Sequence, residues 1–160
     1  MLLMSFLNRV LGRPTKGREG EMPMNDLEIA IKTQDRRALE VALGDAFNEE
    51  LLEVSVPVLI SLCRARWHMC HEDVVSALQK VGDISAVEAI EEIAYVDFEY
   101  LNYDEAFGLA RKATWALADI GDKSAKEALY RIATSPNSVK AAYANKRLQK
   151  WDIELSRKRN

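Results

Sequence analysis

The sequence predicts an all-α protein built from stacked pairs of helices. Two stretches, 73–94 and 112–133, align without a gap at an offset of 39, and ten of the 22 aligned positions are identical. A helical unit of this size cannot bury its own apolar face, so neighbouring units must stack on one another. The identical pairs are Ala77/Ala116, Leu78/Leu117, Gly82/Gly121, Asp83/Asp122, Ser85/Ser124, Ala86/Ala125, Glu88/Glu127, Ala89/Ala128, Ile93/Ile132 and Ala94/Ala133.

Each copy is predicted to form a helix, a tight turn and a second helix. Apolar residues recur at intervals of three and four, which is the spacing of a buried helix face. Gly121 supplies the left-handed conformation that ends a helix, and Asp122 and Ser124 can accept hydrogen bonds from the first N–H groups of the next helix. In the second copy the two faces consist of Leu109, Ala113, Ala116, Leu117 and Ile120, and of Ala125, Ala128, Leu129, Ile132 and Ala133.

Weaker helical patterns lie on both sides of the duplication. We expect Asn25 to cap a helix that residues 32–34 divide into two, and Gly44-Asp45 resembles the later Gly-Asp turns. A helix over 56–63 would complete an imperfect first repeat, and the first helix of the second repeat would span 67–82. A capping helix should run from about 138 to 153. Its inward residues are predicted to be Val139, Ala142, Tyr143 and Leu148.

These patterns divide the chain into three parts. Residues 1–24 form an apolar segment followed by a linker, residues 25–153 form the repeat domain, and residues 154–160 form a basic tail that we expect to be disordered. The segment Met1–Leu11 has three interpretations: a docked or frayed helix, a start at Met4, or a helix that binds a membrane surface or a partner. It is a poor match to a signal peptide, because it lacks a basic start and a cleavage site.

Length and composition describe an ordinary soluble domain. A chain of 160 residues can bury one core, and its net charge of −3 argues against general nucleic-acid binding. Cys63 and Cys70 are too far apart along a helix for a disulfide, which favours a reducing, cytoplasmic setting. No apolar run approaches the length of a membrane span, which is about 20 residues. We expect a monomer in the absence of its partner.

Motifs of catalysis are not found. The sequence has no glycine-rich phosphate loop, nucleophile elbow or Cys-x-x-Cys pair. His68 and His71 share a face at helical spacing, but with Cys63 and Cys70 they match no zinc signature. We therefore predict no enzyme activity, no metal and no cofactor, and we interpret both cysteines as core residues.

The unusual feature is a long stretch without basic residues. Residues 81–110 contain no lysine or arginine but eight carboxylates, and four aromatic residues are interspersed among the last of these. The segment 97–104 could be a solvated loop whose aromatics cover the core, a docking surface for a basic protein, or a cation or small-molecule site. Trp115, on an otherwise polar face, could pack under this loop or anchor an interface. The candidate binding residues are Glu88, Glu91, Glu92, Asp97, Glu99, Tyr100, Tyr103, Asp104 and Trp115.

The duplicated pattern resembles the HEAT-repeat family in its short bacterial form. The matching residues are Arg111, Ala113, Ala116, Leu117, Ile120, Gly121, Asp122, Ala125 and Leu129, and the resemblance covers 72–135. It implies an α-α superhelix, a right-handed solenoid of about three repeats with a C-terminal capping helix. Such arrays generally bind other macromolecules along their second helices.

The resemblance implies a protein-binding role. A short acidic array of this kind is similar to bacterial immunity proteins, which neutralise a cognate and often basic toxin. One alternative is a scaffold or adaptor subunit attached through Met1–Leu11. Another is an enzyme, because related repeats occur in bilin lyases and alkylpurine DNA glycosylases. The acidic composition argues against a glycosylase, and bound pigment would indicate a lyase.

Overall fold

The computed structural model describes residues 26–47, 56–103 and 105–158. The predicted Asn25 cap, the segment 1–24 and Asp104 lie outside these residues. In the described part every regular element is helical, which confirms the all-α class. The elements are α2 (Asp26–Thr33), α3 (Arg36–Ala46), α4 (Val56–Arg64), α5 (His71–Val81), η2 (Ile84–Ala86), α6 (Val87–Tyr95), η3 (Glu99–Leu101), α7 (Gly108–Ile120), α8 (Lys123–Ala133), α9 (Ser138–Gln149) and α10 (Trp151–Lys158).

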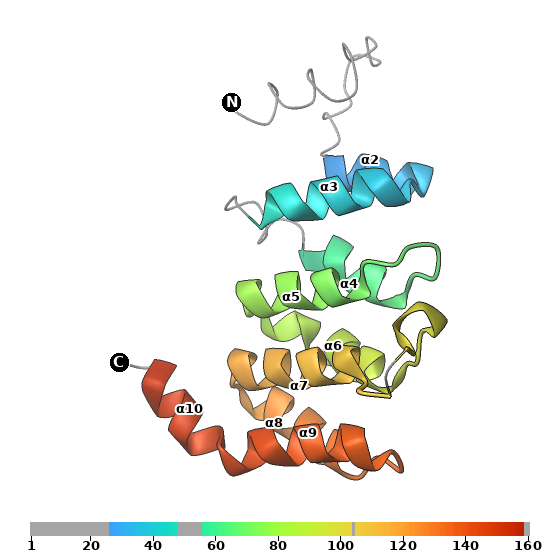
Figure 1. Cartoon of the computed structure of the whole chain (residues 1–160). Coiled ribbons are helices and arrows are strands. Elements are labelled where there is room, and N and C mark those ends of the chain that lie inside the picture. The colour runs from blue at the N-terminus through green and yellow to red at the C-terminus, as the bar shows by residue number, and fades with distance from the viewer. Residues whose placement is uncertain (1–25, 48–55, 104, 159–160) are drawn as a thin grey trace.

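The helices pack in pairs and form two layers (Figure 1). One layer contains α3, α5, α7 and α9, and the other contains α2, α4, α6 and α8. Within the duplication, α5 packs on α7 and α6 packs on α8, while α6 and α7 also pack together across the layers. Helix α9 covers α7 and α8, and α10 turns away from it at the end of the stack.

The two copies of the duplication fold alike at their turns. Gly82 and Gly121 have φ angles of 70° and 69°, and their N–H groups donate to Leu78 O and Leu117 O. The side chain of the next residue then accepts hydrogen bonds from the start of the following helix. Asp83 accepts from one backbone N–H, and Asp122 accepts from two. The predicted apolar faces are buried around these turns, so the helix–turn–helix prediction is confirmed for both copies.

Three predicted boundaries are wrong. Gly44 does not end a helix, because α3 continues through Ala46. Helix α5 begins at His71 rather than near 67, since residues 65–70 form a connection that His68 holds in place. The expected disordered tail is helical through Lys158 as α10, whose Leu155 packs against the core.

The inward face of α9 also differs from the prediction. Val139 and Ala142 are exposed, and Tyr143 and Leu148 are half-buried, whereas the buried residues are Lys140, Ala144 and Arg147. The buried residues follow the i, i+4, i+7 spacing of one helix face. Two of them carry charge, and each has a partner from another part of the chain, as described below. The cap therefore buries two cations that the apolar pattern assigned to solvent.

Candidate protein-binding surface

The carboxylates of α6 are paired with arginines of neighbouring helices. Glu91 forms a two-pronged ion pair with Arg131 of α8, the shorter bond being 2.6 Å. Glu92 forms a similar pair with Arg64 of α4, at 2.7 Å. The stretch of sequence without basic residues therefore does not form an uninterrupted acidic surface on this layer, because arginines of the adjacent helices neutralise both carboxylates. Glu88 remains exposed on the same helix.

Asp97 is paired as well, with the buried lysine of α9. The Lys140 Nζ donates to Asp97 Oδ1 at 2.6 Å and to Tyr95 O at 3.0 Å, and it lies 5.2 Å from the centre of the Phe107 ring. The lysine side chain is 4% exposed and the aspartate 53%. Asp97 thus anchors the start of the α6–α7 connection to the cap, and its contact with a partner stays a prediction.

Two aromatic residues of this connection turn inward. Phe98 stacks on the His71 ring with 3.8 Å between ring centres, and the Tyr100 hydroxyl lies 2.6 Å from His71 Nδ1. The Arg66 guanidinium lies 4.8 Å from the centre of the Phe98 ring. The interpretation in which the loop aromatics cover the core is therefore confirmed for Phe98 and Tyr100. Burial raises the pKa of the Tyr100 hydroxyl to about 12.

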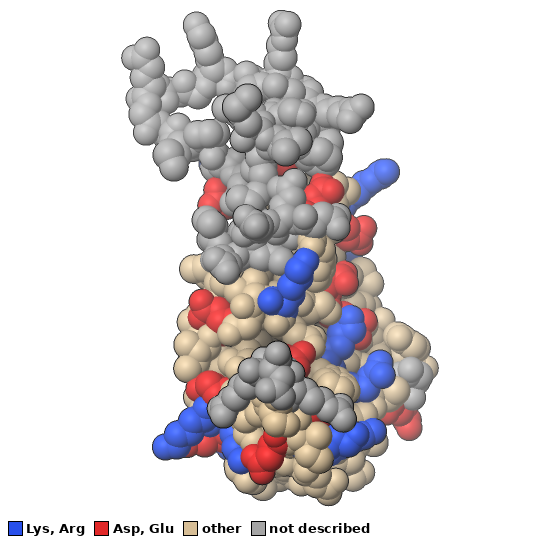
Figure 2. Space-filling model, turned by 90° about the vertical axis from the view of Figure 1, so that its left-hand side faces the viewer, with Lys and Arg blue, Asp and Glu red and all other residues tan. Residues whose placement is uncertain are grey.

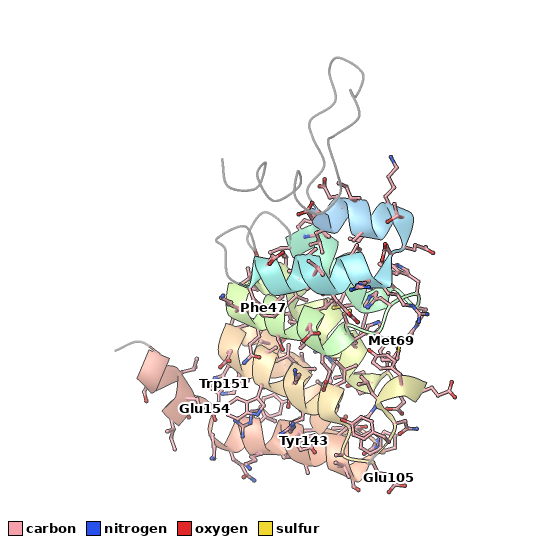
Figure 3. The ribbon with its side chains drawn as sticks, turned by 45° about the horizontal axis from the view of Figure 1, so that its top comes forward. Phe47, Met69, Glu105, Tyr143, Trp151 and Glu154 are labelled. Atoms are coloured by element: carbon pink, nitrogen blue, oxygen red, sulfur yellow. The ribbon has the colours of Figure 1, made fainter. Side chains whose placement is uncertain are left out.

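Beyond Tyr100 the same connection projects outward. Tyr103 is 79% exposed, and Glu99 and Glu105 are exposed on either side of it. The ion pairs found among the described residues involve neither of these carboxylates. Glu105 lies on the same side of the molecule as Met69, away from Trp151 and Glu154 (Figure 3). We call Glu99, Tyr103 and Glu105 the rim patch.

The hollow beneath the connection is small. It is lined by Phe98, Leu101, Phe107 and Lys140 among others, and it encloses about 20 Å³. A water molecule needs at least about 10–15 Å³ on this kind of measure, so the hollow holds little more than one water. This volume argues against the small-molecule interpretation of the loop. What the loop offers a partner is its outer surface.

Trp115 belongs to a different part of the surface. It lies on α7 at 42% exposure, and the Arg147 guanidinium of α9 is stacked 3.6 Å from its ring centre. Arg147 also donates to Glu154 of α10 at 2.9 Å. Trp115 therefore packs against the C-terminal cap rather than under the 97–104 loop. Its contact with Arg147 supports the cap from a partly exposed position.

The two histidines are used by the structure itself. His68 and His71 are 2% and 0% exposed, and each of their ring nitrogens has a polar partner within the chain. Over the described ranges, no group of three His, Cys, Asp or Glu residues could hold a metal ion. Cys63 and Cys70 are free and buried, as predicted for core residues.

Charge on the visible surface is mixed rather than segregated. On the side shown in Figure 2, acidic and basic side chains alternate between patches of uncharged surface. The second-helix layer adds two exposed tyrosines that were not among the predicted residues, Tyr95 at 41% and Tyr130 at 54%. Tyr130 could have been noticed, because it stands where the first copy has Glu91.

No protein-family model, curated protein or solved structure matches the chain. Among the described helices, none is both long enough and apolar enough to cross a membrane.

Proposed function

We propose that this protein is a non-catalytic binding module, a short HEAT-like superhelix that recognises a basic protein through the rim patch. The observation that supports it most is the construction of the α6–α7 connection. Phe98 and Tyr100 are fixed beneath it, and Asp97 is tied to Lys140. Tyr103 and its flanking carboxylates are thereby presented on a supported backbone. A preorganised aromatic side chain loses little conformational entropy when it binds.

The expected partner follows from the chemistry of the patch. Exposed carboxylates accelerate and orient the approach of a positively charged protein, while a tyrosine contributes apolar contact at the centre. Neutralisation of a basic toxin domain is the most concrete role of this kind, and it follows the resemblance to immunity proteins. In this proposal Glu91, Glu92 and Asp97 maintain the scaffold, and Glu99, Tyr103 and Glu105 contact the partner.

The test compares two double charge reversals of equal net charge change. Tagged protein is used to isolate the partner from the native host, and its affinity is then measured by calorimetry at two salt concentrations. We expect Glu99→Lys with Glu105→Lys to weaken binding at least about tenfold, which corresponds to about 1.4 kcal/mol, and to reduce the salt dependence.

The control is Glu127→Lys with Asp152→Lys, two exposed carboxylates of α8 and α10. This control should change the affinity by less than about twofold, because physiological salt screens exposed charges that lie away from the binding surface. Equal effects of the two double variants would contradict the rim patch as the binding surface. A partner whose binding survives Tyr103→Ala would contradict the role of the tyrosine.

A further inference from the structure

His68 and His71 form a buried stack that joins two connections of the chain. Their ring centres are 4.1 Å apart with 25° between the planes, and the His71 ring continues onto Phe98 at 3.8 Å. Trp67 meets the His68 ring edge-on at 5.1 Å. The stack therefore links the α4–α5 connection, which carries both Trp67 and His68, to the α6–α7 connection, which carries the rim patch.

The hydrogen bonds require a neutral ring at His68 and fit a neutral ring at His71. His68 Nε2 is 3.0 Å from Leu62 O, and His71 Nε2 is 2.9 Å from Ala65 O. Carbonyl oxygens only accept, so both Nε2 atoms carry hydrogen. The Cys70 N–H can only donate, so His68 Nδ1 accepts from it at 3.1 Å. In the neutral His71 ring, Nδ1 accepts from the Tyr100 hydroxyl at 2.6 Å.

A further proton would disturb both contacts. On His68 it would occupy the lone pair that faces the Cys70 N–H, which places two donors against each other. On His71 the new N–H would face the Tyr100 hydroxyl, which would lose its own acceptor and would have to turn to accept a second hydrogen bond beside that of the His71 backbone N–H at 3.3 Å. Protonation of both rings would also set two positive charges about 4 Å apart in a site with little water.

The charged groups around the stack come from several elements. Burial is the main cause that lowers the pKa of His68 and takes that of His71 to about 4. Arg36 adds to this effect at His68, and Arg66 adds to it at His71. None of the ring nitrogens is bound to a carboxylate. The titratable groups facing the cluster are Arg36 and Glu40 of α3, Arg66 and Cys70 of the α4–α5 connection, Glu72 and Asp73 of α5, and Tyr100 of η3.

We propose that His68, His71 and Tyr100 form an acid-sensitive clamp, which holds the α6–α7 connection against the α4–α5 connection and releases it when the imidazoles are protonated. The clamp is a property of the fold and can be tested without a partner. Its consequence, that acid weakens binding at the rim patch, rests on the proposed function. The closed clamp is fully favoured above the ordinary histidine pKa of about 6.5 and loses stability as the pH falls toward the lower folded value.

Amide hydrogen exchange of the full chain at pH 7.5 and pH 4.5 tests the clamp. The reporters are the Leu101 and Asn102 amides, which donate to Phe98 O and Glu99 O within η3. If the His71 ring has a pKa of about 4 in the closed clamp and about 6.5 in the open one, linkage makes the opening constant about seventy-fold larger at pH 4.5 than at pH 7.5. After correction for intrinsic rates, we expect the reporters to gain at least tenfold in exchange, while the α8 amides gain less than threefold.

Tyr100→Phe serves as the second arm, because it removes one hydroxyl and leaves both histidines in place. The reporters should then exchange at least fivefold faster at pH 7.5 and respond less to acid. If the reporters and the α8 amides of the wild type gain equally, acid acts on global stability and the clamp is wrong. It is also wrong if Tyr100→Phe matches the wild type at both pH values. The exchange rates are measured without a partner. A failure of the protein to bind a basic partner at pH 7.5 would therefore contradict the proposed function and not the clamp.

Discussion

At the scale of single residues, the two buried cations of α9 differ most from the apolar pattern. A lysine at an inward position is normally unfavourable, because removing an ammonium from water costs several kcal/mol. Lys140 offsets this cost with Asp97 Oδ1, Tyr95 O and the Phe107 ring. Arg147 does so with Glu154 and the Trp115 ring. Sequence spacing could not reveal these positions, since their partners come from other segments of the chain.

For the Lys140–Asp97 pair we predict that the two single substitutions lower the free energy of unfolding by different amounts. Asp97→Ala leaves the buried ammonium with the Tyr95 carbonyl and the Phe107 ring, and we expect it to lower the free energy of unfolding by about 2 kcal/mol. Lys140→Met removes the buried charge and keeps the packing, while Asp97 can turn to solvent, so its cost should be about 1 kcal/mol. The double variant should cost about as much as Lys140→Met. Urea unfolding at a constant m value measures all three. Costs that simply add in the double variant would show that the pair contributes nothing.

At the scale of elements, the duplication predicted helices, turns and apolar faces correctly where both copies agree. The copies share the Gly-Asp turn because a left-handed residue followed by a capping carboxylate is a local requirement. Gly44-Asp45 has the same two residues, yet both lie in the last turn of α3 and do not form a turn between helices. The start of α5 was predicted too early. The contacts of His68 and His71 with Leu62 O and Ala65 O hold 65–70 as a connection, and the local apolar pattern does not reveal such contacts.

The two turn glycines form a matched pair for mutagenesis. A Cβ at Gly82 would meet nothing within 4 Å, whereas one at Gly121 would lie 2.6 Å from Leu155 Cδ2 of α10. Both alanine variants incur the left-handed backbone cost of about 1 kcal/mol. Gly121→Ala should in addition loosen α10, so amides of 151–158 should exchange several-fold faster than in Gly82→Ala.

Exchange measured by mass spectrometry on the C-terminal peptide separates the two effects. Thermal unfolding of the same samples reports the backbone cost that the two variants share. Equal exchange of α10 in both variants would show that the side chain of Leu155 moves aside without loosening the helix. In that case the contact with Gly121 would not hold α10 in place.

At the scale of the whole molecule, spatial neighbours lie about one repeat apart in sequence. Arg131 pairs with Glu91 across 40 residues, and Gln79 donates to Asp119 across the same interval. A stretch without basic residues, such as 81–110, therefore says little about the charge of a surface, because helices before and after it supply arginines. The predicted residues Glu99 and Tyr103 are exposed where the chain leaves the stack, and their contact with a partner stays a prediction. There the α6–α7 connection projects beyond the neighbouring helices.

The same stacking predicts unequal effects for two C-terminal truncations. A chain ending at residue 150 loses α10, and with it the buried Trp151, the contact of Leu155 and the partner of Arg147. The loss of one large buried side chain and a smaller one costs about 3–5 kcal/mol, so this chain should unfold cooperatively at a lower temperature. A chain ending at residue 136 also loses α9, which covers both α7 and α8. It exposes the core of the last repeat and removes Lys140 from Asp97.

We expect the shorter chain to unfold without a single cooperative transition and to bind a hydrophobic dye, since an array needs a terminal unit that covers its apolar end. Circular dichroism on heating, together with dye fluorescence at pH 7.5, distinguishes the two chains. If the chain ending at 136 kept a sharp transition close to that of the chain ending at 150, α9 would not be the cap. The apolar faces of α7 and α8 would then be stable against water without it, and the buried cations of α9 would contribute little to the fold.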